Sequence, residues 1–163
     1  AEASAHYLAA QAKAGADALM LFDSWADGLP DDVFRQIIIK PTVSLMRHLR
    51  ALGVDKPVIG FPRGAGAMLG EYVRETGVQA CGLDTAALPD LVNQMLPEDF
   101  PVQGQLDPLL LLAGGKAMEA RAHELIEAYS QRPHIFNLGH GVMPEVPIAH
   151  VEQLLKIIRG SAG

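Results

Sequence analysis

A histidine between two glycines is the first feature of this sequence that could do chemistry. His140 stands in the segment IFNLGHGVMPE, where an apolar run ends at Asn137 and Gly139 and Gly141 flank the imidazole. An imidazole can donate a hydrogen bond to a carboxylate and can exchange a proton near neutral pH. Flanking glycines leave the ring free of neighbouring side chains and let the backbone approach a ligand closely. A histidine in a turn is equally compatible with a hydrogen-bonded packing role, so these residues alone leave both interpretations open.

Two more polar side chains follow apolar runs in the same way. Ser24 comes after Phe22 and Asp23, and Arg63 comes after Phe61 and a proline. The serine hydroxyl could bind a substrate carboxylate or cap a helix. The guanidinium could face a carboxylate of a ligand or form a surface salt bridge. Phe22 could line a pocket beside Ser24 or belong to the core.

Two aspartates end further apolar runs and could resemble an acid/base pair. Asp84 ends VQACGLDT and Asp107 ends PVQGQLDP. Paired carboxylates on one rim can act as general acid and base. Asp107, however, precedes Pro108, an arrangement typical of a residue that caps a helix. We interpret both aspartates as structural.

The elements that must position these side chains are strands and helices in alternation. Five short runs are apolar almost throughout, which favours parallel strands covered on both faces. Amphipathic stretches lie between them, and an alanine-rich helical pattern with Leu8 on one face precedes the first run. The expected strands lie within 18–25, 57–64, 78–85, 101–108 and 134–141, and the expected helices within 31–52, 67–76, 88–96, 116–129 and 149–158.

Some element boundaries have local signals. Asp31 and Asp32 can cap the helix that begins there, and Pro41 should kink that helix or begin a second one. Gly77 is expected to end the helical stretch at 67–76. The glycine-rich segment GAGAMLG at 64–70 lacks the spacing of a dinucleotide-binding loop and is expected to be a tight turn between strand and helix.

Strand–helix alternation repeated five times predicts an α/β fold with a parallel sheet. An open doubly wound sheet and a closed barrel both place their polar residues at the carboxyl ends of the strands. A complete eight-fold barrel needs about 200 residues or more, and this chain has 163. The chain is therefore expected to be either a small open sheet or a piece of a barrel, in one domain spanning 1–163.

Composition excludes several classes of protein. The chain is 49% hydrophobic and 20% charged with a formal charge of −6, so a basic nucleic-acid-binding surface is not expected. No apolar run approaches a membrane span, and no signal segment opens the sequence. A single cysteine, Cys81, forms no internal disulfide and suits a reducing cytoplasm. The histidines show no metal-binding spacing, so we expect no metal site.

Five segments together resemble the uroporphyrinogen decarboxylase family. They are GADALMLFDSWAD, PVIGFPRGAGAML, TGVQACGLDT, VQGQLDP and IFNLGHGVMPEVPIAHVEQLL. In that family they belong to one (β/α)₈ barrel, from about its fourth strand to its eighth. The resemblance therefore implies a partial barrel of about five βα units, and it implies that the first three strands stand outside this chain. The sequence also begins within a helical pattern and without a methionine, as expected for part of a longer protein.

The resemblance implies a reaction and a set of site residues. The family removes the carboxyl groups of four acetate side chains from uroporphyrinogen III, giving coproporphyrinogen III and CO₂, without a metal or organic cofactor. His140 matches the substrate-binding histidine and is the expected catalytic residue. Ser24 matches the hydroxyl that binds a substrate carboxylate, and Phe22 and Arg63 are expected to line the substrate pocket.

The resemblance also implies what the chain needs from elsewhere. The arginine loop, an aspartate that holds the pyrrole N–H groups and a tyrosine belong to the amino-terminal half of the family's barrel. That half is thus an expected partner, and the isolated chain is expected to be inactive. The family forms homodimers, and the apolar edge strands ALMLFD and HIFNLG predict self-association as well.

Departures from the family pattern are local. Asp27, Thr85 and Gln105 replace residues common in the family, and Gln105 puts any role of the usual asparagine amide in doubt. Two alternatives remain: a half-barrel without catalytic activity, and a relative of the corrinoid methyltransferases. The latter place a zinc-binding H-x-C where this chain has FPRG, which argues against that alternative.

Overall fold

The computed structural model describes residues 1–160 and has two compact units. The first unit comprises Ala1–Gly82 and the second comprises Leu83–Gly163. All strands are parallel in the described pairs, and the strand order is β1-β2-β3-β4-β5. The predicted α/β fold with parallel strands and helices between them is confirmed. The expectation of a single domain stays a prediction.

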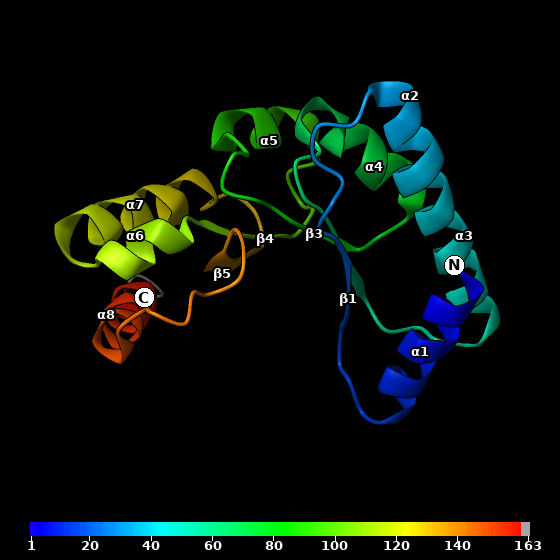
Figure 1. Cartoon of the computed structure of the whole chain (residues 1–163), viewed down its shortest axis with the longest axis horizontal. Helices are drawn as coiled ribbons and strands as arrows, with labels where there is room; N and C mark the ends of the chain where they lie inside the picture. The colour runs from blue at the N-terminus through cyan, green and yellow to red at the C-terminus, as the bar shows by residue number, and fades with distance from the viewer. Residues whose placement is uncertain (161–163) are drawn as a thin grey trace. The chain divides into compact units, whose positions relative to one another are not determined.

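The first unit contains three strands and the helices that follow its loops (Figure 1). Helix α1 lies alongside α3. Its strands pair in register, with Leu21 opposite Gly60 and Phe22 opposite Phe61. The elements are α1 (Glu2–Lys13), β1 (Leu19–Asp23), α2 (Asp31–Phe34), η1 (Arg35–Ile39), α3 (Lys40–Ala51), β2 (Val58–Pro62), η2 (Gly66–Met68), α4 (Leu69–Thr76) and β3 (Ala80–Gly82).

The two sides of β1 and β2 have different neighbours. A Cβ on Gly60 would come within 2.4 Å of the Tyr72 hydroxyl of α4, so the side chain of residue 60 would point toward the helices. Successive residues of a strand point to opposite faces, and paired residues share a face. Leu21 and Asp23 therefore share the helix side with Gly60. Phe22 and Phe61 share the other side, where their rings meet edge to face with centroids 5.9 Å apart.

The helical stretch expected at 31–52 is present but differs at its start and middle. Pro30 occupies the N-cap position and no side chain caps the helix. The expectation that Asp31 or Asp32 caps it is wrong, because Asp31 instead forms an ion pair with Arg35 at 2.6 Å. The π-helical segment η1 ends at Ile39 and a second helix, α3, begins at Lys40 with Pro41 in its first turn, so the expectation that Pro41 begins a second helix is confirmed. A proline is tolerated in the first turn of a helix because it lacks the N–H that only later positions need.

The second unit has two strands and four helices within residues 83–160. Strands β4 and β5 pair in parallel from Val102 opposite His134 to Leu106 opposite Leu138. Helices α6, α7 and α8 contact one another and lie together in Figure 1. The elements are α5 (Pro89–Met95), β4 (Val102–Leu106), α6 (Pro108–Ala113), α7 (Gly115–Ala128), β5 (His134–Leu138) and α8 (Ile148–Gly160).

The expectation that every strand is covered on both faces holds for β2, β3 and β4 but not for β1 and β5. Alternate residues of β5 are exposed, and Ile135 retains 49% of its surface. In β1, Phe22 retains 65%. In β1 and β5, therefore, one face of the strand is exposed although the sequence is mostly apolar. Within residues 1–160, no helix is long and apolar enough to span a membrane.

Candidate functional site

The carboxyl ends of β1 and β2 bring Ser24 and Arg63 together. Each residue directly follows its strand, at the same end of the paired strands. The Arg63 guanidinium donates from Nη1 to the backbone oxygen of Ser24 at 3.3 Å. The Arg63 backbone N–H donates to the backbone oxygen of Asp23 at 3.2 Å. Two contacts across 39 or 40 residues of sequence therefore hold Arg63 against the end of β1.

The Ser24 hydroxyl is not used as a helix cap. The next helix begins only at Asp31, and Pro30 stands at its N-cap position. Within residues 1–160 the hydroxyl has no hydrogen bond, and the residue is partly exposed. The alternative interpretation of Ser24 as a cap is wrong. Phe22 precedes Ser24 by two residues on the chain. Its side chain is largely exposed, as the wall of an open site requires.

Arg63 does not form the surface salt bridge that was the alternative for it. No ion pair joins it to a carboxylate in the part of the chain that the structure describes. Its contacts are to backbone carbonyls at the end of β1. A partly buried guanidinium with one hydrogen bond from Nη1 keeps further N–H groups for an anionic ligand.

Asp23 is a part of this region that sequence reasoning did not single out. Its backbone oxygen accepts hydrogen bonds from the backbone N–H groups of Ala26 and Arg63, at 3.3 and 3.2 Å. Burial on the helix side of β1 raises the pKa of its carboxyl group. The available signal was its place between Phe22 and Ser24, the same short segment that carries the predicted site residues.

At the end of β5, His140 lies on an exposed turn. The turn is anchored by Gly139, whose N–H donates to the Leu106 backbone oxygen at 2.8 Å. A Cβ on Gly139 would come within 2.5 Å of the Thr85 backbone nitrogen, whereas one on Gly141 would meet nothing within 4 Å. The first glycine is therefore required by packing against the loop after β3. Only the second is free to serve a ligand, as was expected of both.

The His140 imidazole forms no hydrogen bond or ion pair with any other residue of 1–160. The residue is exposed, so its ring is available to a ligand. The predicted site residues are distributed over the two units. Phe22, Ser24 and Arg63 are together in the first unit, and His140 belongs to the second.

The two aspartates interpreted as structural have local hydrogen bonds. Asp84 Oδ1 accepts from the Ala86 backbone N–H at 2.8 Å. Asp107 Oδ1 accepts from the Leu109 backbone N–H at 2.8 Å and is the N-cap of α6. Both bonds are those of residues that stabilise a turn or a helix start.

Gln105 is buried and has a structural role that sequence reasoning missed. Its carboxamide accepts from the Tyr129 hydroxyl through Oε1 and donates through Nε2 to the Ala87 backbone oxygen. Burial raises the pKa of Tyr129, which keeps that hydroxyl a donor. The amide at this position connects Tyr129, which follows α7, to the loop after β3.

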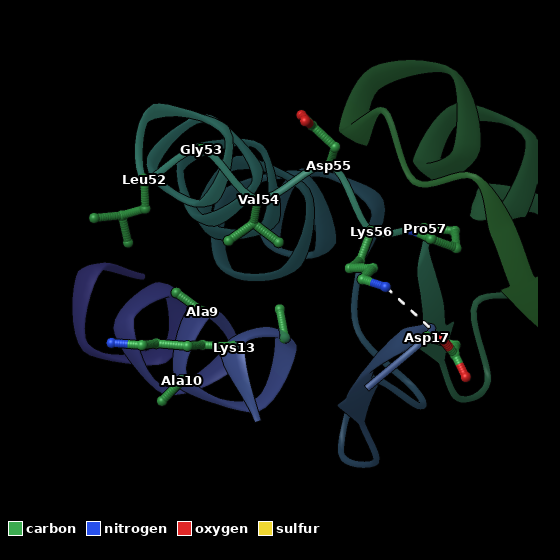
Figure 2. Close-up of a pocket in the computed structure, with 11 residues that line it drawn as sticks. Ala9, Ala10, Lys13, Asp17, Leu52, Gly53, Val54, Asp55, Lys56 and Pro57 are labelled. Atoms are coloured by element: carbon green, nitrogen blue, oxygen red, sulfur yellow. Dashed lines mark ion pairs between the residues drawn. The ribbon is translucent and has the colours of Figure 1, made fainter. Parts of the chain in front are cut away.

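Hollows of the first unit include three that lie beside β1. One of about 220 Å³ lies beside the end of β1, and Asp23 and Thr42 are among its lining residues. Another of about 620 Å³ runs between α1 and β1, beside Tyr7 and Phe22. The third, of about 790 Å³, lies at the opposite, amino ends of β1 and β2. Figure 2 shows Lys56 there pointing toward Asp17, with which it forms an ion pair at 3.8 Å.

The described part of the chain contains no cluster of metal-binding side chains. No three His, Cys, Asp or Glu side chains within residues 1–160 stand close enough to hold a metal ion. Cys81 is a buried cysteine in β3. The polar side chains at the strand ends are instead a hydroxyl, a guanidinium and an imidazole, all of which can bind carboxylates.

The fold has a counterpart of known structure. A methyltransferase from Methanosarcina mazei superposes with a TM-score of 0.80 at 19% sequence identity, covering 99% of this chain and 47% of the other. At that identity the likeness concerns the fold alone. The class defined by the parallel strands, their intervening helices and this likeness is an α/β protein with the architecture of a partial (β/α) barrel.

Sequence comparison then places the chain in a family. The family model for uroporphyrinogen decarboxylase matches residues 1–161. The chain is 64% identical over 161 residues to the uroporphyrinogen decarboxylase of Hyphomonas neptunium and 52% identical over 159 residues to that of Maricaulis maris. It belongs to the uroporphyrinogen decarboxylase family. The matches cover 99% and 98% of this chain but 47% and 46% of the relatives, so the chain spans about half their length.

Proposed function

We propose that this chain supplies the carboxyl-terminal half of the active site of a uroporphyrinogen decarboxylase. The reaction removes the four acetate carboxyl groups of uroporphyrinogen III as CO₂ and gives coproporphyrinogen III, in porphyrin and heme biosynthesis. The observation that carries the proposal is the family match over residues 1–161, joined to three anion-binding side chains at strand ends. The other half of the barrel is the required partner, and the cytoplasm is the proposed location.

We propose that the enzyme uses neither a metal nor an organic cofactor, because the substrate's own pyrrole ring can accept the electrons that decarboxylation releases. Protonation of a pyrrole ring lets the ring accept the electron pair released when the bond between the methylene carbon and the carboxylate breaks. A proton then adds to that carbon, forming a methyl group, and the ring loses its extra proton. Each acetate thus exchanges CO₂ for one proton. The protein must orient a polyanion and deliver protons.

Each candidate residue has a role that suits its surroundings. The Ser24 hydroxyl, without a partner in residues 1–160, donates to the carboxylate of an acetate. Arg63 keeps one contact with the Ser24 backbone and directs its remaining N–H groups to another substrate carboxylate. Phe22 forms an apolar wall. His140, exposed on its turn, binds a carboxylate and exchanges a proton near neutral pH.

The test uses a full-length protein in which these 163 residues are completed by the amino-terminal half of the Hyphomonas neptunium relative. In it, His140→Asn and Ser24→Ala should each lower kcat/KM by an amount equivalent to about 1–3 kcal/mol, the scale of a hydrogen bond to a charged group. Exposed residues of the same types, varied as His123→Asn and Ser130→Ala, are the controls and should change little. The isolated chain should show no decarboxylation.

Two outcomes would contradict this proposal. An unchanged kcat/KM with a lower melting temperature in His140→Asn would make the histidine structural. Turnover by the isolated 163 residues at a rate typical of enzymes would show that the chain needs no other half.

We also propose that the isolated chain self-associates, whether or not homodimers form in the complete enzyme. Strand β1 pairs with β2 and β5 pairs with β4, and both carry large exposed apolar side chains. Unprotected apolar edge strands favour pairing with another chain. Sedimentation velocity at micromolar concentration should show dimers or larger species. A sharp, stable monomer would rule the proposal out.

A further inference from the structure

Phe22, the exposed aromatic side chain of the proposed site, contacts a buried ring of the next strand. Phe61 lies directly opposite Phe22 in the β1–β2 pair. The two rings meet edge to face, with centroids 5.9 Å apart and an angle of 76° between their planes. Phe22 retains 65% of its surface, whereas Phe61 retains 5%. One ring of this pair is therefore held inside the fold, and the other projects from it.

A glycine on the third strand makes room for the Phe61 ring. Cys81 lies opposite Gly60 in the β2–β3 pair. The next residue on each strand continues that register and brings Gly82 beside Phe61. A Cβ on Gly82 would come within 2.7 Å of Cδ2 and 3.1 Å of Cβ of Phe61. Gly82 is not among the glycines with a positive φ, so the Phe61 side chain, and not the backbone conformation, requires a glycine there.

The contact with Phe61 limits the orientations that the Phe22 ring can adopt. A side chain on a β-strand commonly populates two χ1 rotamers, and an exposed side chain has little packing around it to favour one of them. A residue directly opposite on the neighbouring strand is a close cross-strand neighbour, and aromatic pairs favour an edge-to-face arrangement. Phe61 cannot move aside easily, because it is buried and lies against Gly82. Phe61 is thus the fixed member of the pair.

We propose that Phe61 is a positioning residue for the candidate site. Packed over Gly82, it holds the exposed Phe22 ring in one orientation, so that the apolar wall is formed before a substrate binds. A side chain that must be ordered on binding lowers the affinity, whereas one that is ordered beforehand does not. The use of this wall by a pyrrole ring of the substrate rests on the proposed function. The ordering of Phe22 by Phe61 does not.

The first measurement is made on the 163-residue chain and needs no substrate. NMR of the chain with labelled phenylalanine gives the three-bond couplings that report χ1 of Phe22. We expect one dominant rotamer in the parent chain, although the ring is exposed. In Phe61→Leu, Phe22 should average over two rotamers, and Gly82→Ala, which displaces the Phe61 ring, should shift the Phe22 ring signals. Phe34→Leu, a change at a buried phenylalanine of α2, should leave Phe22 unaffected.

The second measurement uses the completed full-length protein of the decarboxylase assay. Phe61→Leu should raise KM by about three- to tenfold with little change in kcat, because an ordered wall binds substrate and transition state alike. Phe22→Leu should raise KM by at least as much. The double variant should be no worse than Phe22→Leu alone, since Phe61 acts only through that ring. Phe34→Leu should leave KM unchanged. Full multiplication of the Phe61 and Phe22 effects would contradict the positioning role.

Two NMR results would overturn the proposal. One is a parent chain in which Phe22 averages over several rotamers, a result that requires no variant to fold. The other is a Phe61→Leu chain in which Phe22 keeps the rotamer of the parent. Should Phe22 be ordered by Phe61 while Phe22→Leu leaves KM unchanged, the proposed use of Phe22 as a substrate wall fails and its ordering by Phe61 stands.

Discussion

Ser24 and Asp107 occupy the same kind of position, but only the Asp107 side chain caps a helix. Each is a polar residue near the carboxyl end of a parallel strand, β1 for the serine and β4 for the aspartate. Helix α6 begins directly after Asp107, so the aspartate carboxyl accepts from the Leu109 N–H and caps the helix. After Ser24 the next helix begins only at Asp31 and is preceded by Pro30. A polar side chain next to a helix start forms a hydrogen bond with a backbone N–H group of the helix, whereas one on a longer loop stays available to a ligand.

Gly139 and Gly141 extend the same comparison to backbone positions and provide the largest expected effect. Gly139→Ala should destabilise the protein by about 1–3 kcal/mol, because the new Cβ would press on the Thr85 backbone, which cannot move aside as a side chain could. Gly141→Ala, at a position with open space around it, should change the free energy of unfolding by less than about 0.5 kcal/mol. Urea unfolding of both variants measures the difference. Equal effects would contradict the assignment of Gly139 to packing.

The direct test of the comparison removes the two polar side chains and measures stability rather than activity. Asp107→Ala should lower the free energy of unfolding by about 1 kcal/mol through loss of the N-cap. Ser24→Ala should lower it by less than about 0.5 kcal/mol, because the hydroxyl bonds to nothing within residues 1–160. Chemical denaturation curves of the two variants provide the numbers. A serine variant as destabilised as the aspartate variant would mean that Ser24 serves the fold.

A smaller, pH-dependent effect is expected from His134 in the second unit. Burial lowers the pKa of this imidazole below its ordinary value, while its Nε2 donates to the Gly104 backbone oxygen at 2.7 Å. The unfolded state therefore binds a proton more readily, and stability from this group is fully present above about pH 6.5 and declines as the pH falls below that value. Melting temperatures between pH 8 and pH 5 should show the decline. His134→Phe should flatten it, and the exposed His123→Gln should not.

Much of the fold was predictable because its signals are local. The five apolar runs each contain the strand found there, and Gly77 closes α4 in a left-handed conformation, as expected. Asp107 followed by Pro108 predicted a cap because both partners of that hydrogen bond lie within three residues. The Asp31 prediction failed for a related reason: its carboxyl pairs with Arg35, an equally local partner that single-residue preferences do not weigh.

The candidate site was predictable only as a set of residue types at strand ends. Ser24, Arg63 and His140 stood out because hydroxyl, guanidinium and imidazole groups follow apolar runs. Asp23 did not stand out, because the burial that raises the pKa of its carboxyl depends on residues elsewhere in the chain that lie beside the end of β1. Gln105 stood out only as a departure from the family pattern, and its buried hydrogen bond with Tyr129 depends on a residue 24 positions away.

The sequence by itself determined the alternation of strands and helices and the residues that follow each strand, because periodicity, caps and turns act over a few residues. Tertiary structure alone decided which of those polar residues remain available. The Arg63 contact with the Ser24 carbonyl spans 39 residues, the Tyr129 contact with Gln105 spans 24, and Gly139 meets Thr85 from another loop. Such contacts depend on the distance between side chains in the folded protein, which local sequence preferences do not specify.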